Sequence, residues 1–441
     1  MKLYFILIIL FFFNNCSFDN KSGIWKSDNI ITNQEKNIFK DFKKISTSEE
    51  IFNKIVPFDN KYKFKILPSI NNLKWQDIYF NEGNNLKNLK FNNSNQIVFK
   101  SKKLSRNKVN NYLLFENDNL IISDEKGNII VFSIKKKKII SKFNFYKKRY
   151  KGVKKKLNLF LENNIIYISD NIGYLYSFDY KNNKIIWATH YKLPLKSNLK
   201  IAGNKIISAD VNNNLVFFSK STGEILKLIP TENITITNNF VNNLSQYKDN
   251  LFFLNSYGSL YSSNTESMNL KWSINLSPSL NLNQTNLFNG SEIINDGSRI
   301  IVSSNNNTFL IEAKTGTVLS EFNFSSIIKP ILHNGIGFFV TKNNLLVAIN
   351  LKNAKVLYSQ DITLQVAKFL STKKKSLSYK NIMLLNGEIF IFLKNSFILN
   401  FNNNGELKEI KKLPSKINTF PIIIDSSILF LNSSKKLIIV D

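Results

Sequence analysis

The sequence predicts an all-β protein, an eight-bladed β-propeller of four-stranded antiparallel blades. Three observations lead to this fold. A unit of strand, short polar turn, strand, polar turn and strand recurs eight times. The units follow one another at similar spacings, as repeat architectures do. The last unit lacks its outermost strand, which an N-terminal segment would supply to close the ring.

The repeating unit is clearest between residues 165 and 191. Its strands are Ile165–Asp170, Tyr174–Asp179 and Lys184–Tyr191, separated by turns rich in Asn, Gly and Lys. Sheets of this kind bury their faces when they stack radially around an axis. We therefore expect a propeller over residues 69–441. The corresponding strands begin at Leu120, Ile165, Ile206, Leu251, Ile300, Phe338, Ile389 and Ile428, at spacings of 45, 41, 45, 49, 38, 51 and 39 residues.

Ring closure is predicted from the two ends of the repeat array. The final unit stops at Asp441, at the end of its second repeat strand, so an outermost strand is missing. In the fourth unit that strand opens with Asn-Leu-Lys-Trp at residues 269–272, and the same four residues occur at 72–75. We predict that residues 71–79, through Leu73 and Trp75, complete the last blade.

The N-terminus has the features of an export signal. Met1-Lys2 is followed by an apolar core, Leu3–Phe13, which is too short to span a bilayer, so residues 1–15 are expected to be a signal peptide. Cys16 is the only cysteine, which excludes a disulfide framework. Its position resembles a bacterial lipobox, which implies lipidation of Cys16; a soluble protein cleaved nearby is the alternative. Ser17 resembles the sorting signal of outer-membrane lipoproteins, and residues 16–68 are expected to form a polar tether.

The formal charge of +29 permits two interpretations. Lys, Asn, Ile and Phe are abundant along the whole chain, as codon usage in an AT-rich genome would produce. Alternatively, a basic propeller would bind polyanions such as lipopolysaccharide or polysaccharide. The basic runs lie in turns between apolar runs and no nucleic-acid-binding motif surrounds them, so no nucleic-acid partner is expected.

The sequence shows no constellation for catalysis. His190 and His333 are expected at the surface or in turns, and no Cys/His cluster has the spacing of metal ligands. No vicinal cysteines, Gly-rich phosphate loop or G-x-S-x-G motif occurs. We expect no catalytic residue, metal or cofactor. Four aspartates at strand ends are expected to accept turn N–H groups: Asp124, Asp170, Asp179 and Asp210.

The repeats resemble the pyrroloquinoline-quinone-type propeller repeat, whose pattern ends in Gly-Lys and a Trp. Residues 177–187, from Ser177 to Trp187, fit this pattern well, and residues 219–224, 311–316 and Trp272 fit in part. Most other tryptophans of the pattern are missing. Tyr358, Leu228 and Ile410 stand near the expected places, so the stacks between blades should be partly aliphatic.

Within that superfamily the chain resembles the BamB family, lipoproteins of the outer-membrane β-barrel assembly (BAM) complex. Residues 271–283 resemble the family loop that binds the periplasmic domains of the barrel protein BamA. Leu280 and Leu282 match, whereas Asn283 replaces an Arg, and Ser325 and Ile327 replace an acidic pair. In an extended segment the two leucines would point the same way and form a small apolar anchor. They would alternatively cap the local core.

This resemblance implies a non-enzymatic scaffold on the periplasmic face of the outer membrane, attached through a lipid anchor. Its implied partners are BamA and other assembly subunits, with nascent outer-membrane proteins as possible clients. An exported quinoprotein-like enzyme is the competing hypothesis from another class.

Overall fold

A computed structural model describes residues 52–146, 150–232, 241, 243–277, 288, 290–304 and 306–441, and the backbone of two short N-terminal strands. The chain divides into two compact units, residues 1–49 and 50–441. In the first, β1 (Cys16–Phe18) pairs antiparallel with β2 (Trp25–Ser27). The predicted signal peptide, residues 1–15, lies outside the described residues.

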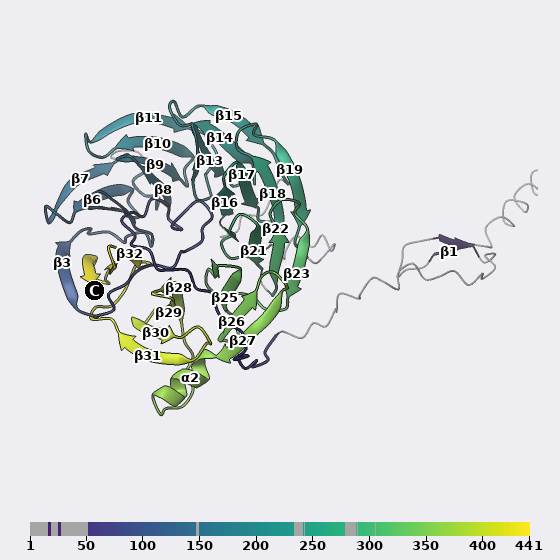
Figure 1. The fold of residues 1–441 in the computed structure, drawn as a ribbon. Coiled ribbons are helices and arrows are strands. Elements are labelled where there is room, and N and C mark those ends of the chain that lie inside the picture. The colour runs from purple at the N-terminus through teal and green to yellow at the C-terminus, as the bar shows by residue number, and fades with distance from the viewer. Residues whose placement is uncertain are drawn as a thin grey trace, which may run out of the picture. The chain divides into compact units, whose positions relative to one another are not determined.

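The second unit is a ring of eight four-stranded antiparallel sheets, which confirms the predicted fold class (Figure 1). Seven blades follow the chain from the innermost strand outward. Blade 1 contains β4 (Leu114–Glu116), β5 (Asn119–Ser123), β6 (Asn128–Ser133) and β7 (Lys138–Asn144). Blade 2 contains β8 (Leu157–Glu162), β9 (Ile165–Asp170), β10 (Tyr174–Asp179) and β11 (Lys184–His190). Blade 3 contains β12 (Lys200–Ala202), β13 (Lys205–Ala209), β14 (Leu215–Ser219) and β15 (Ile225–Ile229).

The remaining blades repeat this order. Blade 4 contains β16 (Asn243–Tyr247), β17 (Asn250–Leu254), β18 (Ser259–Asn264) and β19 (Leu270–Asn275). Blade 5 contains β20 (Ile294–Asn295), β21 (Arg299–Ser303), β22 (Thr308–Glu312) and β23 (Val318–Phe322). Blade 6 contains β24 (Ile331–His333), β25 (Ile336–Val340), β26 (Leu345–Asn350) and β27 (Lys355–Asp361). Blade 7 contains β28 (Tyr379–Leu385), β29 (Glu388–Leu393), β30 (Phe397–Phe401) and β31 (Leu407–Lys412).

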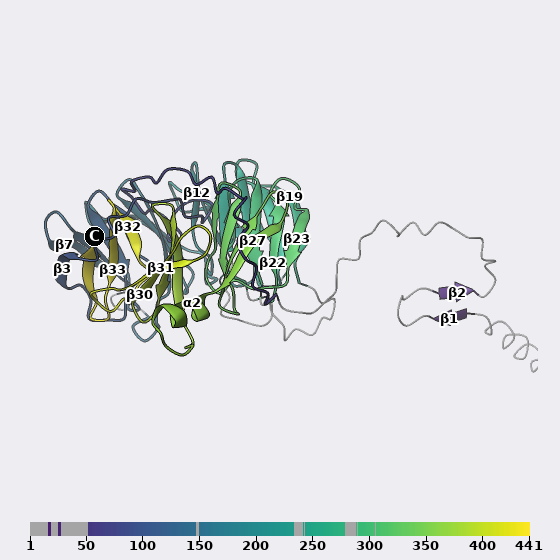
Figure 2. The same ribbon diagram turned by 60° about the horizontal axis from the view of Figure 1, so that its bottom comes forward.

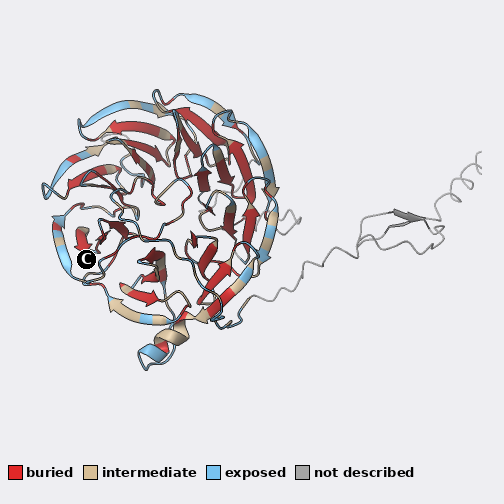
Figure 3. Ribbon diagram, viewed as in Figure 1, coloured by how far each residue is buried: buried red, intermediate tan, exposed pale blue. Residues whose placement is uncertain are grey.

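Blade 8 takes strands from both ends of the chain. It contains β32 (Ile422–Ile424), β33 (Ser427–Leu431), β34 (Lys436–Val440) and, outermost, β3 (Ile97–Lys103). The eight repeat strands predicted from the sequence are the second strands of the eight blades. Their side chains are almost entirely buried, whereas the outermost strands are mostly exposed or half-buried (Figure 3). Residues 357–359 of the outermost strand of blade 6 are an exception, because they are buried.

Ring closure by an N-terminal strand is confirmed, but the predicted segment is wrong. β3 pairs antiparallel with β34, with Ile97 opposite Val440 and Lys100 opposite Ile438. Trp75 instead exchanges two 2.8 Å backbone hydrogen bonds with Phe115 of β4, at the centre of the ring. Its side chain is buried against Phe80, whereas Leu73 is exposed. An outermost strand would not bury Trp75 in this way, so the shared Asn-Leu-Lys-Trp does not mark equivalent strands.

The predicted aspartate turns between the second and third strands are confirmed. In blades 1, 2 and 3, Oδ1 of Asp124, Asp170 and Asp210 accepts backbone N–H groups from residues two and four positions further along the chain. Asp179 accepts the N–H groups of Lys181 and Asn182 in the next turn of blade 2. These carboxylates therefore have a structural role.

Aromatic residues of three outermost strands dock on glycines of the following blade. Trp187, Trp272 and Tyr358 lie over Gly223, Gly316 and Gly405, where an added Cβ would fall 2.4–2.6 Å from the ring atoms. Each glycine also has a positive φ. Leu228 and Ile410 lie one residue beyond the equivalent positions, which strand pairing assigns to Lys227 and Glu409. Lys227 and Glu409 therefore occupy these two positions, and Ile410 instead packs against the core of blades 6 and 7.

The propeller unit begins earlier than the predicted boundary at residue 69. Residues 52–68, which we call the strap, cross blade 6 from its outer edge to its inner strand. Val56 exchanges backbone hydrogen bonds of 3.0 and 2.9 Å with Ser359 of β27, and Leu67 N–H donates to His333 Nε2 at 3.0 Å. Phe58 and Phe64 pack against Tyr358. These aromatic side chains supply apolar surface that a solvated tether would not bury.

Candidate functional site

Residues 72–92, the axial segment, run through the middle of the ring (Figure 1). They contact the inner strand or its neighbouring turn in each blade. Backbone groups and small polar side chains of this segment form hydrogen bonds with backbone groups of the inner strands. The backbone and amide partners are Trp75 with Phe115, Gln76 with Leu161, Glu82 with Gln246, Gly83 with Asn295, Asn85 with Leu332, Leu89 with Leu384, and Asn72 with Ile423.

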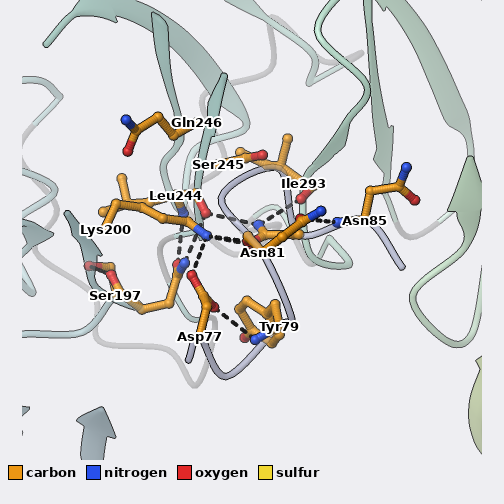
Figure 4. Close-up of polar contacts among 12 residues, drawn as sticks. Asp77, Tyr79, Asn81, Asn85, Ser197, Lys200, Leu244, Ser245, Gln246 and Ile293 are labelled. Carbon is orange, nitrogen blue, oxygen red and sulfur yellow. Dashed lines mark hydrogen bonds and ion pairs between the residues drawn. The ribbon is translucent and has the colours of Figure 1, made fainter. Parts of the chain in front are cut away.

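Blade 3 meets the axial segment through a buried ion pair (Figure 4). Lys200 Nζ lies 2.6 Å from Asp77 Oδ2 and 2.7 Å from Asn84 Oδ1, and it also donates to the carbonyl of Asn81. Asn84 Nδ2 in turn donates to the carbonyls of Leu244 and Ile293. Burial lowers the pKa of Lys200, and the Asp77 carboxylate opposes that shift. The pair is fully hydrogen-bonded, so its role is to join blades 3, 4 and 5 to the axial segment.

A cavity of about 130 Å³ lies beside the axial segment. Its walls include Tyr79, Tyr112 and Phe420, and Lys329 and Lys380 also line it. Lys329 Nζ donates to the carbonyls of Tyr79 and Asn84, at 3.0 and 2.9 Å, and Lys380 Nζ donates to the carbonyl of Asn418 at 2.7 Å. Burial lowers the pKa of both lysines to about 8. Both amines donate hydrogen bonds to carbonyls, and each lies over an aromatic ring, Tyr79 for Lys329 and Phe420 for Lys380. The two lysines therefore stabilise the centre of the ring.

The connections between successive blades lie at one end of the ring, because each runs from an outermost strand to the next inner strand. The predicted partner residues Leu280, Leu282 and Asn283 belong to the connection between blades 4 and 5 and lie outside the described residues. On either side of them, Leu276 N–H donates to Gly258 O at 2.9 Å and Phe288 N–H donates to Ser256 O at 3.1 Å. Both sides of this connection are therefore fixed to one turn, residues 255–258.

Glu232 holds that turn in place and has no signal in the local sequence. Its carboxylate accepts hydrogen bonds from Asn255 Nδ2 and Ser259 Oγ, each at 2.6 Å, and from Tyr261 Oη at 2.5 Å. Burial opposes ionisation, but the hydrogen bonds from Ser259 and Tyr261 keep the pKa of Glu232 below its usual range. Glu232 comes from the preceding connection, between blades 3 and 4, so only the folded ring brings it to Asn255.

The neighbouring connection, between blades 5 and 6, carries Ser325 and Ile327. Ser325 is buried and its hydroxyl donates to Ser304 O at 2.5 Å. Ile327 is 43% exposed and borders the axial cavity. The BamB family has acidic residues at these two positions. Here Ser325 offers a hydroxyl that already donates a hydrogen bond within the protein, and Ile327 offers an exposed apolar side chain.

The two histidines occupy different environments. His190 is exposed at the end of β11 and stacks on Tyr174 at 4.2 Å, as a surface residue would. The prediction for His333 is wrong, since this residue is buried in β24, where it accepts the Leu67 N–H. Burial lowers its pKa. In the described part of the chain, no group of three or more His, Cys, Asp or Glu residues is arranged to hold a metal ion.

Solved structures similar to this chain share its fold at low sequence identity. BamB from Moraxella catarrhalis is 12% identical, with a TM-score of 0.61, covering 78% of this chain and 99% of that chain. A quinohemoprotein alcohol dehydrogenase from Comamonas testosteroni is 11% identical, with a TM-score of 0.58 and coverages of 83% and 80%. A europium-containing methanol dehydrogenase is 9% identical, with a TM-score of 0.60 and coverages of 82% and 88%.

These structural likenesses establish the propeller fold alone, and the comparison with curated protein sequences finds no match. The family models are more specific. The model described as outer membrane protein assembly factor BamB matches residues 125–360, which is more than half of the chain and spans blades 2 to 5 with parts of blades 1 and 6. This chain belongs to the family of outer membrane protein assembly factor BamB.

Proposed function

We propose that this protein is a non-enzymatic scaffold lipoprotein of the BAM complex that binds the periplasmic domains of a BamA-type barrel protein. The observation that carries the proposal is the fixed base of the connection between blades 4 and 5. Hydrogen bonds to one turn hold both sides of residues 278–287, and the exposed Ile327 belongs to the adjacent connection at the same end. A rigid base of this kind reduces the entropy lost when a partner binds.

The chemistry of this contact is apolar. Leu280 and Leu282 are the proposed anchors, Ile327 extends the apolar surface, and Asn283 replaces a charged contact. A few desolvated apolar side chains supply most of the binding free energy in many interfaces. Binding to the barrel protein should therefore depend weakly on salt.

Outer edges of the blades are the proposed contact for nascent outer-membrane proteins. The strap provides the precedent, because Val56 pairs through both backbone groups with the outer edge of β27. The outer strands β11 and β15 expose apolar side chains, including Ile186 and Leu226. An extended chain with alternating apolar residues could add to such an edge in the same way.

Attachment to the outer membrane would come from lipidation of Cys16, with the propeller on the periplasmic face. No helix among the described residues is long and apolar enough to cross a membrane. Other assembly subunits are further expected partners.

The centre of the ring supports the quinoprotein hypothesis less well than the scaffold proposal. The axial segment passes through this centre, and the cavity of about 130 Å³ is below the range of roughly 300–1,000 Å³ usual for small-molecule sites. The polyanion hypothesis rests on the charge of +29 and predicts binding that falls steeply with salt.

The test is capture of the barrel protein from solubilised membranes by Leu280→Asp/Leu282→Asp. The matched control is Leu270→Asp/Leu319→Asp, which adds the same charges to exposed leucines of blades 4 and 5, near the starts of their outermost strands and thus toward the opposite end. We expect the first variant to lose capture by roughly tenfold or more and the control to keep it. Equal capture by both variants would reject the site.

A further inference from the structure

The α-helix among the described residues stands on the outside of the ring (Figure 2). α2 (Ile362–Phe369) follows the outermost strand of blade 6 directly. Its first residue and Ala367 are buried against the propeller, but Phe369 and Leu370 at its end are each 50% exposed. We call residues 368–375 the α2 tip. Unlike the exposed apolar pairs on the outermost strands, Phe369 and Leu370 lie at the end of a helix that stands on the outside of the ring.

The α2 tip is held rigidly in this exposed position. Asp361 caps the helix by accepting the Leu364 N–H at 2.9 Å. Gln365 connects the helix to blade 7, donating to Gly405 O and accepting the Leu407 N–H. At the far end, Thr372 N–H donates to Ala367 O at 2.9 Å. The apolar pair therefore does not fold back onto the blade.

Positive charge surrounds the apolar pair. Lys368, Lys373, Lys374 and Lys375 are all exposed. The sequence has no Asp or Glu between Asp361 and Glu388, and Asp361 pairs with Lys374 at 2.8 Å. An apolar wedge within a cluster of lysines is the combination that binds an anionic lipid surface, because the apolar side chains enter the headgroup boundary while the lysines contact phosphates.

The strap begins at the same end of the ring. Its first described residue, Phe52, donates its N–H to Asn323 O, just beyond the end of β23, while α2 follows the end of β27. Val56 pairs with Ser359, two residues before the helix cap. The chain segment that leads back toward Cys16 thus leaves the propeller unit beside the blade that carries α2.

We propose that the α2 tip is a membrane-contact site that inserts Phe369 and Leu370 into an anionic lipid surface, with Lys368, Lys373 and Lys375 bound to lipid phosphates. Together with the lipid proposed on Cys16 it would supply a second membrane signal and orient the ring. The site does not depend on the partner contact at Leu280 and Leu282, so either proposal can fail without the other.

The experiment uses the full chain with Cys16→Ala and one new cysteine, Thr372→Cys, which carries an environment-sensitive nitrobenzoxadiazole probe. The matched control carries the probe at Asn204→Cys. Asn204 lies in an exposed turn of blade 3, at the end of the ring opposite to α2. Vesicles contain phosphatidylethanolamine with phosphatidylglycerol, or phosphatidylcholine alone. Residues 1–15 are present in every variant, so membrane binding by that segment affects all samples equally.

We expect a blue shift at position 372 with anionic vesicles and quenching by spin-labelled lipid, with neither effect at position 204. Phe369→Ser/Leu370→Ser should abolish the shift, and Lys373→Gln/Lys375→Gln should weaken vesicle affinity by about thirtyfold. Near-ultraviolet circular dichroism checks that both variants are folded. No shift at 372 with anionic vesicles, or an equal shift with phosphatidylcholine or in the serine variant, would overturn the proposal.

Discussion

Tyr358 shows how much of a blade junction depends on one residue. It is fully buried, it docks on Gly405 of the next blade, and Phe58 and Phe64 of the strap cover its other side. Its hydroxyl has no hydrogen-bond partner among the described residues. Burial strongly raises its pKa, so the hydroxyl stays neutral well above pH 10. The ring rather than the hydroxyl therefore stabilises the junction.

Two substitutions of Tyr358 should have different effects on stability. Tyr358→Phe removes an unsatisfied buried hydroxyl and should leave the free energy of unfolding unchanged or raise it by up to about 1 kcal/mol. Tyr358→Ala leaves a cavity and should lower it by about 3–5 kcal/mol. Urea unfolding monitored by circular dichroism measures both. A loss above about 2 kcal/mol for Tyr358→Phe would show that the hydroxyl has a partner and that this interpretation is wrong.

At the scale of elements, the sequence reveals local patterns better than pairings. The second strands of all eight blades were predictable because each is a short apolar run bounded by turn residues, as at Ile165–Asp170. The closing strand was not predictable in the same way. A match of four residues does not show which strands pair, and it is seven-residue β3 that pairs with β34. α2 was also missed, although the longest repeat spacing, between Phe338 and Ile389, contains it.

Closure by β3 predicts a specific disulfide. In a Cys16→Ala background, Lys100→Cys and Ile438→Cys stand opposite each other in adjacent strands. Opposite residues of an antiparallel pair have Cα atoms roughly 4.5–5.5 Å apart, which a disulfide can bridge. The oxidised protein should migrate faster on a non-reducing gel and melt at a higher temperature. Leu73→Cys with Ile438→Cys is the control and should stay reduced. A disulfide in the control pair, with none in the first pair, would show that residues 71–79 close the ring after all.

At the scale of the whole molecule, the axial segment and the ring depend on each other. The hydrogen bonds from Asn84 to Leu244 and Ile293 join residues that are 160 and 209 positions apart in the sequence. No local pattern encodes such contacts, so neither the filled centre nor the role of Glu232 was predictable. The proposed partner face is suggested in the sequence only by the resemblance to the BamB family, because its apolar residues form no distinctive motif.

One end of the ring is proposed to bind the barrel protein. Hydrogen–deuterium exchange of the full chain, with and without purified BamA-type periplasmic domains, measures this contact residue by residue. We predict that the partner slows exchange in residues 276–293 and 323–330, and leaves unchanged the turns at the opposite end, such as residues 134–137, 181–183 and 221–224. Protection confined to those opposite turns, or no protection anywhere at saturating partner, would contradict the account.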